Sequence, residues 1–471
     1  MNDETGFPTP PAAPPAMPPL GPPFAPPDAP TPPPRFPNVP PEQWPAAGFP
    51  VWGRKPAEPP PPPPGQSTLT PALVAALVTF IVVLVGAFAY SQTGGEGTVL
   101  PRGTTTTSTD PFASSESSSP ATTTTAPLEL SAVIDDIKEF VEQERGLQFT
   151  SDVPVNLADE QQFNERLFAT FEETLPQVEE SGQVLHALGL LDKSSDIVAD
   201  MRTLLAAGVG GFYDPETKEL VVRGTTTTPF VRQILAHELT HALDDQHFAL
   251  HRPELDTADD ETGFGFTALV EGDARRVEDA YFASMSIEDQ QAAEEERLEF
   301  LAQHPELQRL PQVLLLLLQV PYSEGETFVL RLLAAGQARL DAAFAAPPVT
   351  SEQVLDPEKF LANEGPVAVT PPDPVGGARA LNRGVLGSVL FAILFDSAGS
   401  SASPAVEYWG GDQYVTWTDG TRICVRDVLV GDDDVATTHL GESLALWART
   451  AGNGATVEQD RDGNLVITSC Q

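Results

Sequence analysis

The sequence predicts an α+β protein that is mostly helical and carries a small strand-rich subdomain at its C-terminus. Apolar residues recur at helical spacing through most of residues 128–400. Within this region a single hairpin pattern, GFYDPETKELVV, separates helical segments. Beyond residue 400 the pattern changes, and QYVTW, TRICVRDV and NLVITSC are typical of strands around a helix at Leu440–Thr450. We therefore expect a helical domain over 128–400 and an α+β subdomain over 401–471.

Three segments of biased composition precede these domains. Proline accounts for 48 of 471 residues and is concentrated before residue 65, so residues 1–70 predict a disordered or polyproline-like tail. Residues 71–90 contain an uncharged apolar run, and a helix of that length crosses a hydrocarbon core of about 30 Å. A cleaved signal peptide fits poorly because the run begins far from the N-terminus. We predict a transmembrane helix.

Residues 91–127 are mostly Thr, Ser, Gly and Pro, which is typical of an exposed linker. Arg54 and Lys55 precede the apolar run, whereas Arg102 follows it. This small excess of positive charge predicts a cytoplasmic N-terminus. The sequence thus predicts a single-pass membrane protein whose folded domain lies outside the cytoplasm, with a Pro-rich tail that could bind a partner in the cytoplasm.

Charge and cysteine content narrow the class of protein. The formal net charge of −41 argues against a nucleic-acid partner, because no basic surface could neutralise phosphates. The two cysteines, Cys424 and Cys470, do not form a C-x-x-C motif, so they do not predict a structural zinc site. In an exported domain a disulfide between them is the leading interpretation, with two buried thiols as the alternative.

The predicted elements of the helical domain follow in chain order. Leu130–Arg145 is predicted to be an amphipathic helix, because its apolar residues share one face. An extended segment around Val153–Leu157 and further helical segments to about Ala207 come next. The hairpin at Gly211–Val222 turns at Asp214-Pro215.

A helix then begins at Thr228, which is a good N-cap, with Pro229 in the first helical position. Two later apolar runs, Val313–Leu318 and Val385–Phe395, are too short to span a bilayer. We predict that both belong to buried core helices. The acidic segment Glu288–Glu299 is predicted to be a solvated helix, with an inhibitory cap as the alternative.

The helix after Thr228 contains an HExxH motif formed by His237, Glu238 and His241. Residues four apart lie on one face of a helix, so the two imidazoles can bind a single metal ion. Zinc lowers the pKa of bound water towards about 7, and the neighbouring Glu238 can then act as general base. We predict one catalytic Zn²⁺. The alternative is a pair of structural histidines.

Zinc requires a third protein ligand, for which the first candidate is Glu271 in FTALVEGDARRVEDAYF. Ala268, Gly272 and Ala274 surround this glutamate with small side chains, which would let its helix approach the HExxH helix closely. The alternative interpretation is an ordinary surface glutamate.

The second candidate is His247, six residues after His241, which is the spacing of the HExxHxxGxxH pattern. Asp244 occupies the position of the glycine at which the chain turns back in that pattern. Asp tolerates the left-handed conformation better than most residues, so His247 stays an alternative metal ligand. Met285 could then serve as a downstream methionine turn.

The string HELTHA, followed by Asp245 four residues after the second histidine, resembles the active helix of the gluzincins, the thermolysin-like zinc peptidases. More broadly, residues 128–471 resemble uncharacterised bacterial metallopeptidases. In that group a YDP hairpin precedes AHELTHAL and an LVEGDA helix follows, and PPVTSEQVLDPEKF and YWGGDQY also look similar. The resemblance implies a zincin-like catalytic domain.

The same resemblance implies the roles of individual residues: His237, His241 and Glu271 as zinc ligands and Glu238 as general base. Asp245 would orient a ligating histidine by a hydrogen bond to the ring nitrogen that does not bind the metal. Thermolysin-like enzymes carry an aspartate four residues after the glutamate ligand, whereas this chain has Arg275 there. The residues that orient the metal ligands therefore differ from those of thermolysin-like enzymes, or they come from another part of the chain.

Three side chains are candidates for stabilising an oxyanion, and the sequence does not choose among Tyr322, Tyr408 and His439. An edge strand above the site could hold a substrate by main-chain pairing. Val221–Val222 or Val153–Leu157 could supply it, although a purely structural hairpin is an equal alternative.

Together these patterns predict a membrane-anchored zinc metallopeptidase that hydrolyses a protein or peptide substrate with a metal-activated water. The rival hypothesis is a non-catalytic surface interaction protein that keeps a peptidase scaffold on a stalk. A degenerate scaffold usually loses a histidine or the glutamate, whereas this chain retains His237, Glu238 and His241.

Overall fold

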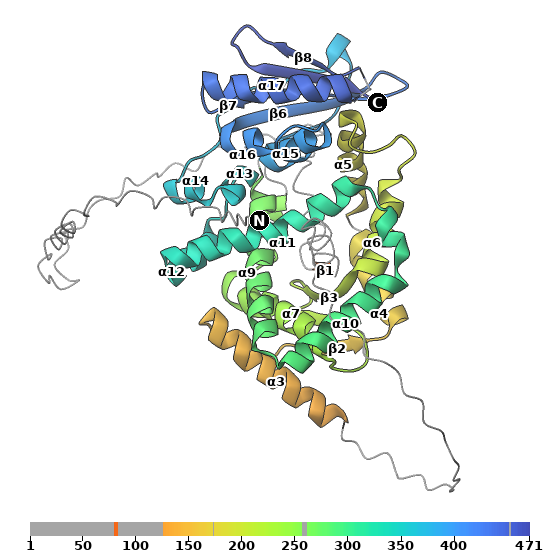
Figure 1. The fold of residues 1–471 in the computed structure, drawn as a ribbon, viewed down its shortest axis with the longest axis vertical. Helices are drawn as coiled ribbons and strands as arrows, with labels where there is room; N and C mark the ends of the chain where they lie inside the picture. The colour runs from red at the N-terminus through yellow and green to blue at the C-terminus, as the bar shows by residue number, and fades with distance from the viewer. Residues whose placement is uncertain (1–79, 83–125, 173, 257–260, 452–453) are drawn as a thin grey trace, which may run out of the picture. The chain divides into compact units, whose positions relative to one another are not determined.

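The computed structural model describes residues 80–82 and 126–471, except 173, 257–260 and 452–453 (Figure 1). These residues form helices and two β-sheets, which confirms the predicted mixture of helix and sheet. The predicted Pro-rich tail and the predicted Ser/Thr-rich linker lie outside the described residues, apart from the last two linker residues, which begin the first helix after the linker.

The predicted membrane helix at 71–90 also lies outside the described residues, except for Phe80–Val82. These three residues form strand β1, antiparallel to β3 (Val209–Asp214), so their backbone is paired with a sheet and is not helical. One described helix, α11 (Gln312–Ala335), is long and apolar enough to cross a membrane. It lies in the middle of the chain, and 44% of its most apolar window is buried within the protein.

The first part of the fold is a group of helices around a small sheet. The predicted helix ending at Arg145 is present as α3, whose buried stripe has the helical spacing Ile137, Val141 and Arg145. The elements up to the hairpin are α3 (Ala126–Arg145), β2 (Val155–Ala158), α4 (Glu160–Glu172), α5 (Leu175–Leu188) and α6 (Ile197–Gly208).

The small sheet has the order β1-β3-β4-β2. Strands β3 and β4 (Glu219–Arg223) form the predicted antiparallel hairpin, and β2 joins β4 in parallel. The turn forms because the Asp214 carboxylate accepts hydrogen bonds from the N–H groups of Glu216 and Thr217. Lys218 then takes the left-handed conformation, with φ of 61°.

The HExxH helix begins where the sequence predicts. The Thr228 hydroxyl accepts a hydrogen bond from the N–H of Val231, and Pro229 occupies the first helical turn. The helices in this region are α7 (Pro229–Phe248), α8 (Pro253–Asp256), α9 (Thr262–Ser284) and α10 (Ile287–Gln303). The predicted acidic helix is α10, which is exposed along most of its length.

Helix α11 crosses α9 at very short range. A Cβ atom on Gly272 would lie 2.1 Å from the backbone of Gly325, and one on Gly325 would lie 2.2 Å from the carbonyl oxygen of Ala268. Only glycine therefore fits at this crossing. Shorter helices surround α11: η2 (Pro305–Arg309), α12 (Gln337–Ala345), α13 (Ser351–Leu355) and α14 (Pro357–Ala362).

The C-terminal part is an antiparallel five-stranded sheet with the order β5-β6-β7-β9-β8. Its elements are η3 (Val375–Gly377), β5 (Ala380–Gly384), α15 (Gly387–Ser397), α16 (Ser403–Tyr408), β6 (Trp409–Thr418), β7 (Ile423–Gly431), α17 (Asp434–Thr450), β8 (Thr456–Gln459) and β9 (Leu465–Cys470). Cys424 and Cys470 face each other on paired strands and form the predicted disulfide.

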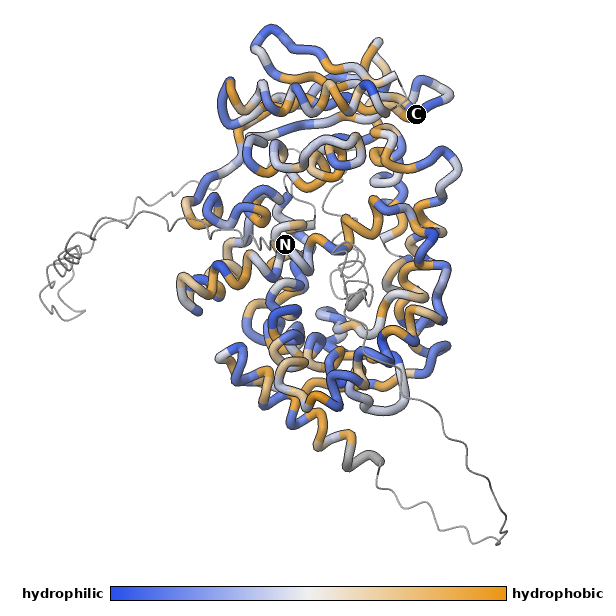
Figure 2. The backbone as a smooth tube through the Cα atoms, viewed as in Figure 1, coloured by the Kyte–Doolittle hydropathy of each residue, from blue (hydrophilic) through white to orange (hydrophobic). Residues whose placement is uncertain are grey.

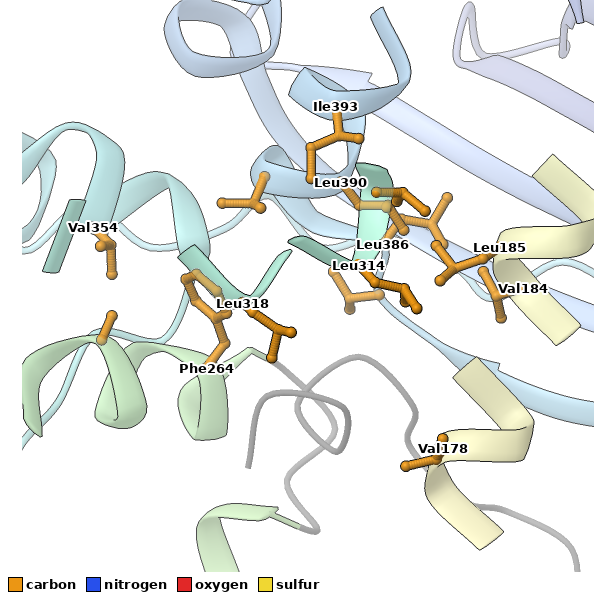
Figure 3. Packing of buried hydrophobic residues seen from close by; sticks show 14 of the residues in the cluster. Val178, Val184, Leu185, Phe264, Leu314, Leu318, Val354, Leu386, Leu390 and Ile393 are labelled. Atoms are coloured by element: carbon orange, nitrogen blue, oxygen red, sulfur yellow. The ribbon is translucent and has the colours of Figure 1, made fainter. Parts of the chain in front are cut away.

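The predicted boundary at residue 401 is not a break in packing. Strand β5 precedes it, yet pairs with β6 in the C-terminal sheet. Buried apolar residues from helices on both sides of the boundary belong to one cluster, and apolar stretches occur in the helices of both parts (Figure 2). Figure 3 shows part of this continuous core, where Leu185 of α5 and Leu314 of α11 meet Leu390 of α15.

Candidate metal centre

Helices α7 and α9 bring His237, His241 and Glu271 together. One ligand atom from each residue lies within 4.8 Å of the other two. All three side chains are buried, with at most 1% of their surface exposed. The structure thus assembles the two HExxH histidines with the first of the two candidates for the third ligand.

The ring nitrogens converge on a single carboxylate oxygen. His237 Nε2 lies 3.2 Å from Glu271 Oε2, and His241 Nε2 lies 3.5 Å from the same oxygen. The two imidazole rings are nearly perpendicular, with centroids 4.7 Å apart. Three donor atoms that surround one point in this way are arranged to hold a cation.

Unsatisfied polar atoms show that these residues fit a metal ion. Within the described part of the chain, neither ring nitrogen of His241 makes a hydrogen bond, and the same holds for Glu271 Oε1 and both carboxylate oxygens of Glu238. Buried polar atoms are normally satisfied. Two imidazoles and one carboxylate form a donor set that suits a divalent ion and leaves a position for water.

Glu278 completes the surroundings of His237. Its Oε2 lies 3.1 Å from His237 Nδ1, so the carboxylate fixes the orientation of the ring and directs Nε2 towards the cluster. Gln233 and Arg275 in turn donate hydrogen bonds to Glu278 at 2.8 Å and 3.1 Å. Arg275 therefore helps to hold the carboxylate that orients His237.

The sequence analysis missed Glu278, although a signal for it was present. Glu278 follows Glu271 by seven residues, two helical turns, so both side chains lie on the same face of α9. The helical spacing could have identified it as a partner of the HExxH helix.

The electrostatics of the cluster favour positive charge. Burial lowers the pKa of His237, but the hydrogen bonds that its ring donates to the carboxylates of Glu271 and Glu278 outweigh burial and raise it to about 10. Burial raises the pKa of Glu271, but the two histidines outweigh this effect and lower it. Burial lowers the pKa of His241. The carboxylates around His237 therefore favour a positive charge in the cluster, which a bound metal ion would supply in place of the proton on His237.

Glu238 lies beside the three ligand residues under strand β3. A Cβ atom on Gly211 would come within 3.3 Å of Glu238 Cγ, so the strand passes directly over this side chain. Burial raises the pKa of Glu238 well above its ordinary value. The N–H of Tyr213 faces the carboxyl and opposes this shift without the geometry of a full hydrogen bond.

Of the three candidates for an oxyanion-stabilising residue, only Tyr322 lies at the cluster. Its ring stacks on His237 with centroids 6.1 Å apart, and its hydroxyl hydrogen-bonds to Glu271. Tyr408 and His439 instead stack on each other, on α16 and α17 of the C-terminal part.

The small residues around Glu271 have a different role from the one predicted. The sequence analysis assigned them to the contact between α9 and the HExxH helix. In the structure Ala268 and Gly272 instead contact the backbone of α11 at Gly325. Because Gly325 follows Tyr322 by one turn, this close crossing places the tyrosine beside Glu271.

Asp245 does not contact a histidine of the cluster, contrary to the role that the resemblance implies. Its carboxylate accepts hydrogen bonds from the Tyr213 hydroxyl at 2.7 Å, from Lys218 Nζ at 2.6 Å and from the N–H of Leu250 at 2.9 Å. Since Tyr213 and Lys218 belong to the hairpin, Asp245 fixes the strand that covers Glu238.

His247 also lies outside the cluster. Helix α7 continues unbroken through Asp244 to Phe248, so the chain does not turn back as the HExxHxxGxxH pattern requires. His247 Nε2 instead lies 2.8 Å from the carbonyl oxygen of Gln148, at an exposed position. Met285 ends α9 as its C-cap residue.

The strand nearest to Glu238 is β3, which neither of the two predicted segments contains. Val221 and Val222 belong to β4, a central strand, and β2 lies at the far edge of the sheet. The hairpin pattern predicted both strands, but it did not predict that β3 is the strand that passes over Glu238.

No family of known proteins matches this chain, and no curated protein or solved structure matches it. The likeness to gluzincins therefore rests on HELTHA and on the segments around it. The function has to be inferred from the chemistry of the site.

Proposed function

We propose that this protein is a metal-dependent hydrolase. The observation that carries the proposal is the buried cluster of His237, His241 and Glu271, whose ligand atoms converge beside the unpartnered carboxylate of Glu238. More specifically, we propose a zinc metallopeptidase of the gluzincin type, because the third ligand is a glutamate from a second helix. The catalytic domain would then be zincin-like.

His237, His241 and Glu271 would hold the ion, and Glu278 would keep His237 in the correct orientation. A bound zinc ion would lower the pKa of a coordinated water and polarise a substrate carbonyl. Glu238 would accept a proton from the attacking water and deliver it to the leaving amine.

Tyr322 would donate a hydrogen bond from its hydroxyl to the developing oxyanion. Burial and the carboxylates of Glu271 and Glu238 raise the pKa of Tyr322 well above its ordinary value, so its hydroxyl stays protonated. We therefore assign it the role of electrophilic helper.

The test uses the full-length chain, purified in detergent, with Glu238→Gln beside wild type. Glu288→Gln is the matched control, because Glu288 undergoes the same chemical change at an exposed site on α10. Bound metal is quantified by elemental analysis, and cleavage of a denatured protein mixture is followed by mass spectrometry. We expect one zinc per chain in all three proteins, with cleavage by wild type and the control only.

Cleavage that survives in Glu238→Gln would contradict the proposed base. Stoichiometric zinc without cleavage by any of the proteins would leave a metal protein that is not a general peptidase. Tyr322→Phe should retain zinc and lose cleavage activity by about 100-fold or more, the range for one oxyanion donor.

The disulfide supports the proposal that the domain lies outside the cytoplasm. Cys424–Cys470 is closed, and disulfides form and persist in oxidising compartments. A membrane helix over 71–90 and the pairing of Phe80–Val82 with β3 exclude each other. Flotation of membranes from cells that express the full chain or a deletion of 71–90 decides between them, since an anchored protein floats only when that segment is present.

A further inference from the structure

Beside the metal cluster lies a second buried group of charges, which we call the arginine cluster: Arg145, Asp244, Asp273 and Asp341. Arg145 is the last residue of α3 and is completely buried. Its Nε lies 2.8 Å from Asp244 Oδ1 and 2.6 Å from Asp273 Oδ2, and its Nη1 lies 2.9 Å from Asp341 Oδ1. One guanidinium thus connects α7, α9 and α12.

Both buried aspartates stand next to metal ligands in the chain. Asp244 follows His241 by three residues on α7, and Asp273 follows Glu271 by two residues on α9. A single nitrogen of Arg145 bridges them, so the guanidinium fixes the separation of the two ligand helices at the level of the ligands. None of these contacts belongs to the catalytic groups themselves.

The packing around Arg145 holds its planar group in one orientation. The rings of Phe248 and Phe344 each lie with their centroids 5.3 Å from the guanidinium carbon. Burial lowers the pKa of Arg145, but the carboxylates of Asp244 and Asp273 outweigh burial and raise it, so the positive charge is retained. An arginine provides several donors in a fixed plane, which a lysine does not.

From this arrangement we infer that Arg145 is a positioning residue for the metal centre. It acts by holding α7 and α9 at the separation at which His241 and Glu271 can share one ion. This role rests on the proposed function, because it requires that the cluster binds a metal. Helix α3, which supplies no ligand, is then part of the metal centre, and it is the first helix after the predicted linker.

The test compares Zn²⁺ affinity among full-length variants, by competition with a chromophoric chelator at a temperature far below unfolding. Arg145→Lys keeps the charge and changes the donor geometry. Arg145→Met combined with Asp244→Asn and Asp273→Asn removes the bridge without leaving a buried carboxylate unpaired, and Arg276, which also pairs with Asp273, keeps Glu144 at 3.7 Å. Arg422→Lys is the control, because Arg422 makes an exposed ion pair with its side chain 51% accessible. Circular dichroism verifies folding.

We expect both Arg145 variants to bind Zn²⁺ about tenfold or more weakly than wild type, the range for residues that orient metal ligands. The visible absorption of bound Co²⁺ should also change, because it reports ligand geometry. The control should match wild type in both measurements. A residue that only stabilises the fold would lower the melting temperature and leave both readouts unchanged.

The inference is overturned if folded Arg145→Lys and the triple variant bind Zn²⁺ as wild type does, with unchanged Co²⁺ spectra. A wild type that binds no Zn²⁺ overturns the metal centre and this inference together. A wild type that binds Zn²⁺ but cleaves no protein contradicts only the peptidase proposal, and the comparison of affinities still decides the role of Arg145.

Discussion

The metal centre and the arginine cluster place buried carboxylates a few residues apart on the same two helices, yet they are neutralised differently. In the arginine cluster Asp244 receives its counter-charge from Arg145, and Asp273 receives it from Arg145 and Arg276, so the cations belong to the chain. In the metal centre Glu271 faces His237 and His241, and neither ring nitrogen of His241 has a hydrogen-bond partner in the described part of the chain. The difference separates a site where the protein supplies its own cation from one that could hold a metal ion.

A third group of buried carboxyls is neutralised neither by an arginine nor by a possible metal ion. Asp427 and Asp412 face each other on β7 and β6, and burial together with this like-charged neighbour raises the pKa of Asp427 well above its ordinary value. Asp412 accepts hydrogen bonds from two N–H groups and from Trp409 Nε1. Here burial and the neighbouring carboxyl favour the protonated form of Asp427, which would need no cation beside it.

The largest effect should come from removing the internal cation. Arg145→Met leaves Asp244 buried without its cationic partner, whereas Asp273 still pairs with Arg276, and we expect a cost of about 3–5 kcal/mol of unfolding free energy. Urea denaturation of the full chain with and without Zn²⁺ measures this loss, with Arg422→Met as the control. Because the missing charge is not at the metal centre, added Zn²⁺ should not restore the stability of the variant. A loss below about 1 kcal/mol would mean that the cluster is not held by its arginine.

Removing a ligand from the metal centre should act on metal affinity. His241→Ala should weaken Zn²⁺ binding by more than about 100-fold, beyond the range for residues that only orient ligands. Isothermal titration of the full chain measures the affinity. His439→Ala serves as the control, since that histidine lies on α17 with its side chain 45% exposed. Unchanged affinity in His241→Ala would place the metal elsewhere.

Changing Glu278, which orients His237, should have a smaller effect on Zn²⁺ affinity than removing a ligand. Glu278→Gln preserves the size of the side chain but weakens the charged hydrogen bond to His237 Nδ1. Zn²⁺ affinity should fall by about tenfold. The same titration, with the exposed Glu288→Gln as control, measures it. If Glu278→Gln and Glu288→Gln gave equal affinities, the assignment of Glu278 as the orienting group would be wrong.

The smallest effect concerns the proton at Asp427. The folded protein keeps this proton above pH about 4, where the unfolded chain has lost it, so the unfolding free energy falls as pH rises towards the folded pKa. The slope is at most about 1.4 kcal/mol per pH unit. Asp427→Asn cannot ionise and should lose this component. Denaturation at pH 5 and about pH 8 compares the two proteins, and an identical pH dependence would show that Asp427 is ionised in the folded state.

Local patterns predicted the parts of the site that lie on one element. The HExxH spacing placed His237, Glu238 and His241 on one helix, and Thr228-Pro229 fixed where that helix begins. The hairpin was predicted in the same way, because turn residues and strand patterns act over short distances, whereas the disulfide was predicted from the presence of two cysteines in a domain expected to be exported. Capping and periodicity depend on neighbours in sequence, so the sequence contains them explicitly.

Such local patterns could not predict the contacts between helices and strands that lie far apart in the chain. The choice of Glu271 over His247 depended on whether α7 continues through Asp244, and the selection of Tyr322 depended on the glycine crossing of α9 and α11. The boundary expected at residue 401 was not a break in the core, since β5 pairs across it.

The sequence by itself therefore determined the chemistry that this chain can offer: two histidines and a glutamate at helical spacing, a second helix with a candidate ligand, and two cysteines able to close a disulfide. Only the tertiary structure decided which distant groups complete that chemistry, namely Glu278 and Tyr322 around the ligands and Arg145 between the helices. The physical reason is that periodicity fixes the face on which a side chain lies, whereas the partner of that face is chosen by packing among segments far apart in the chain.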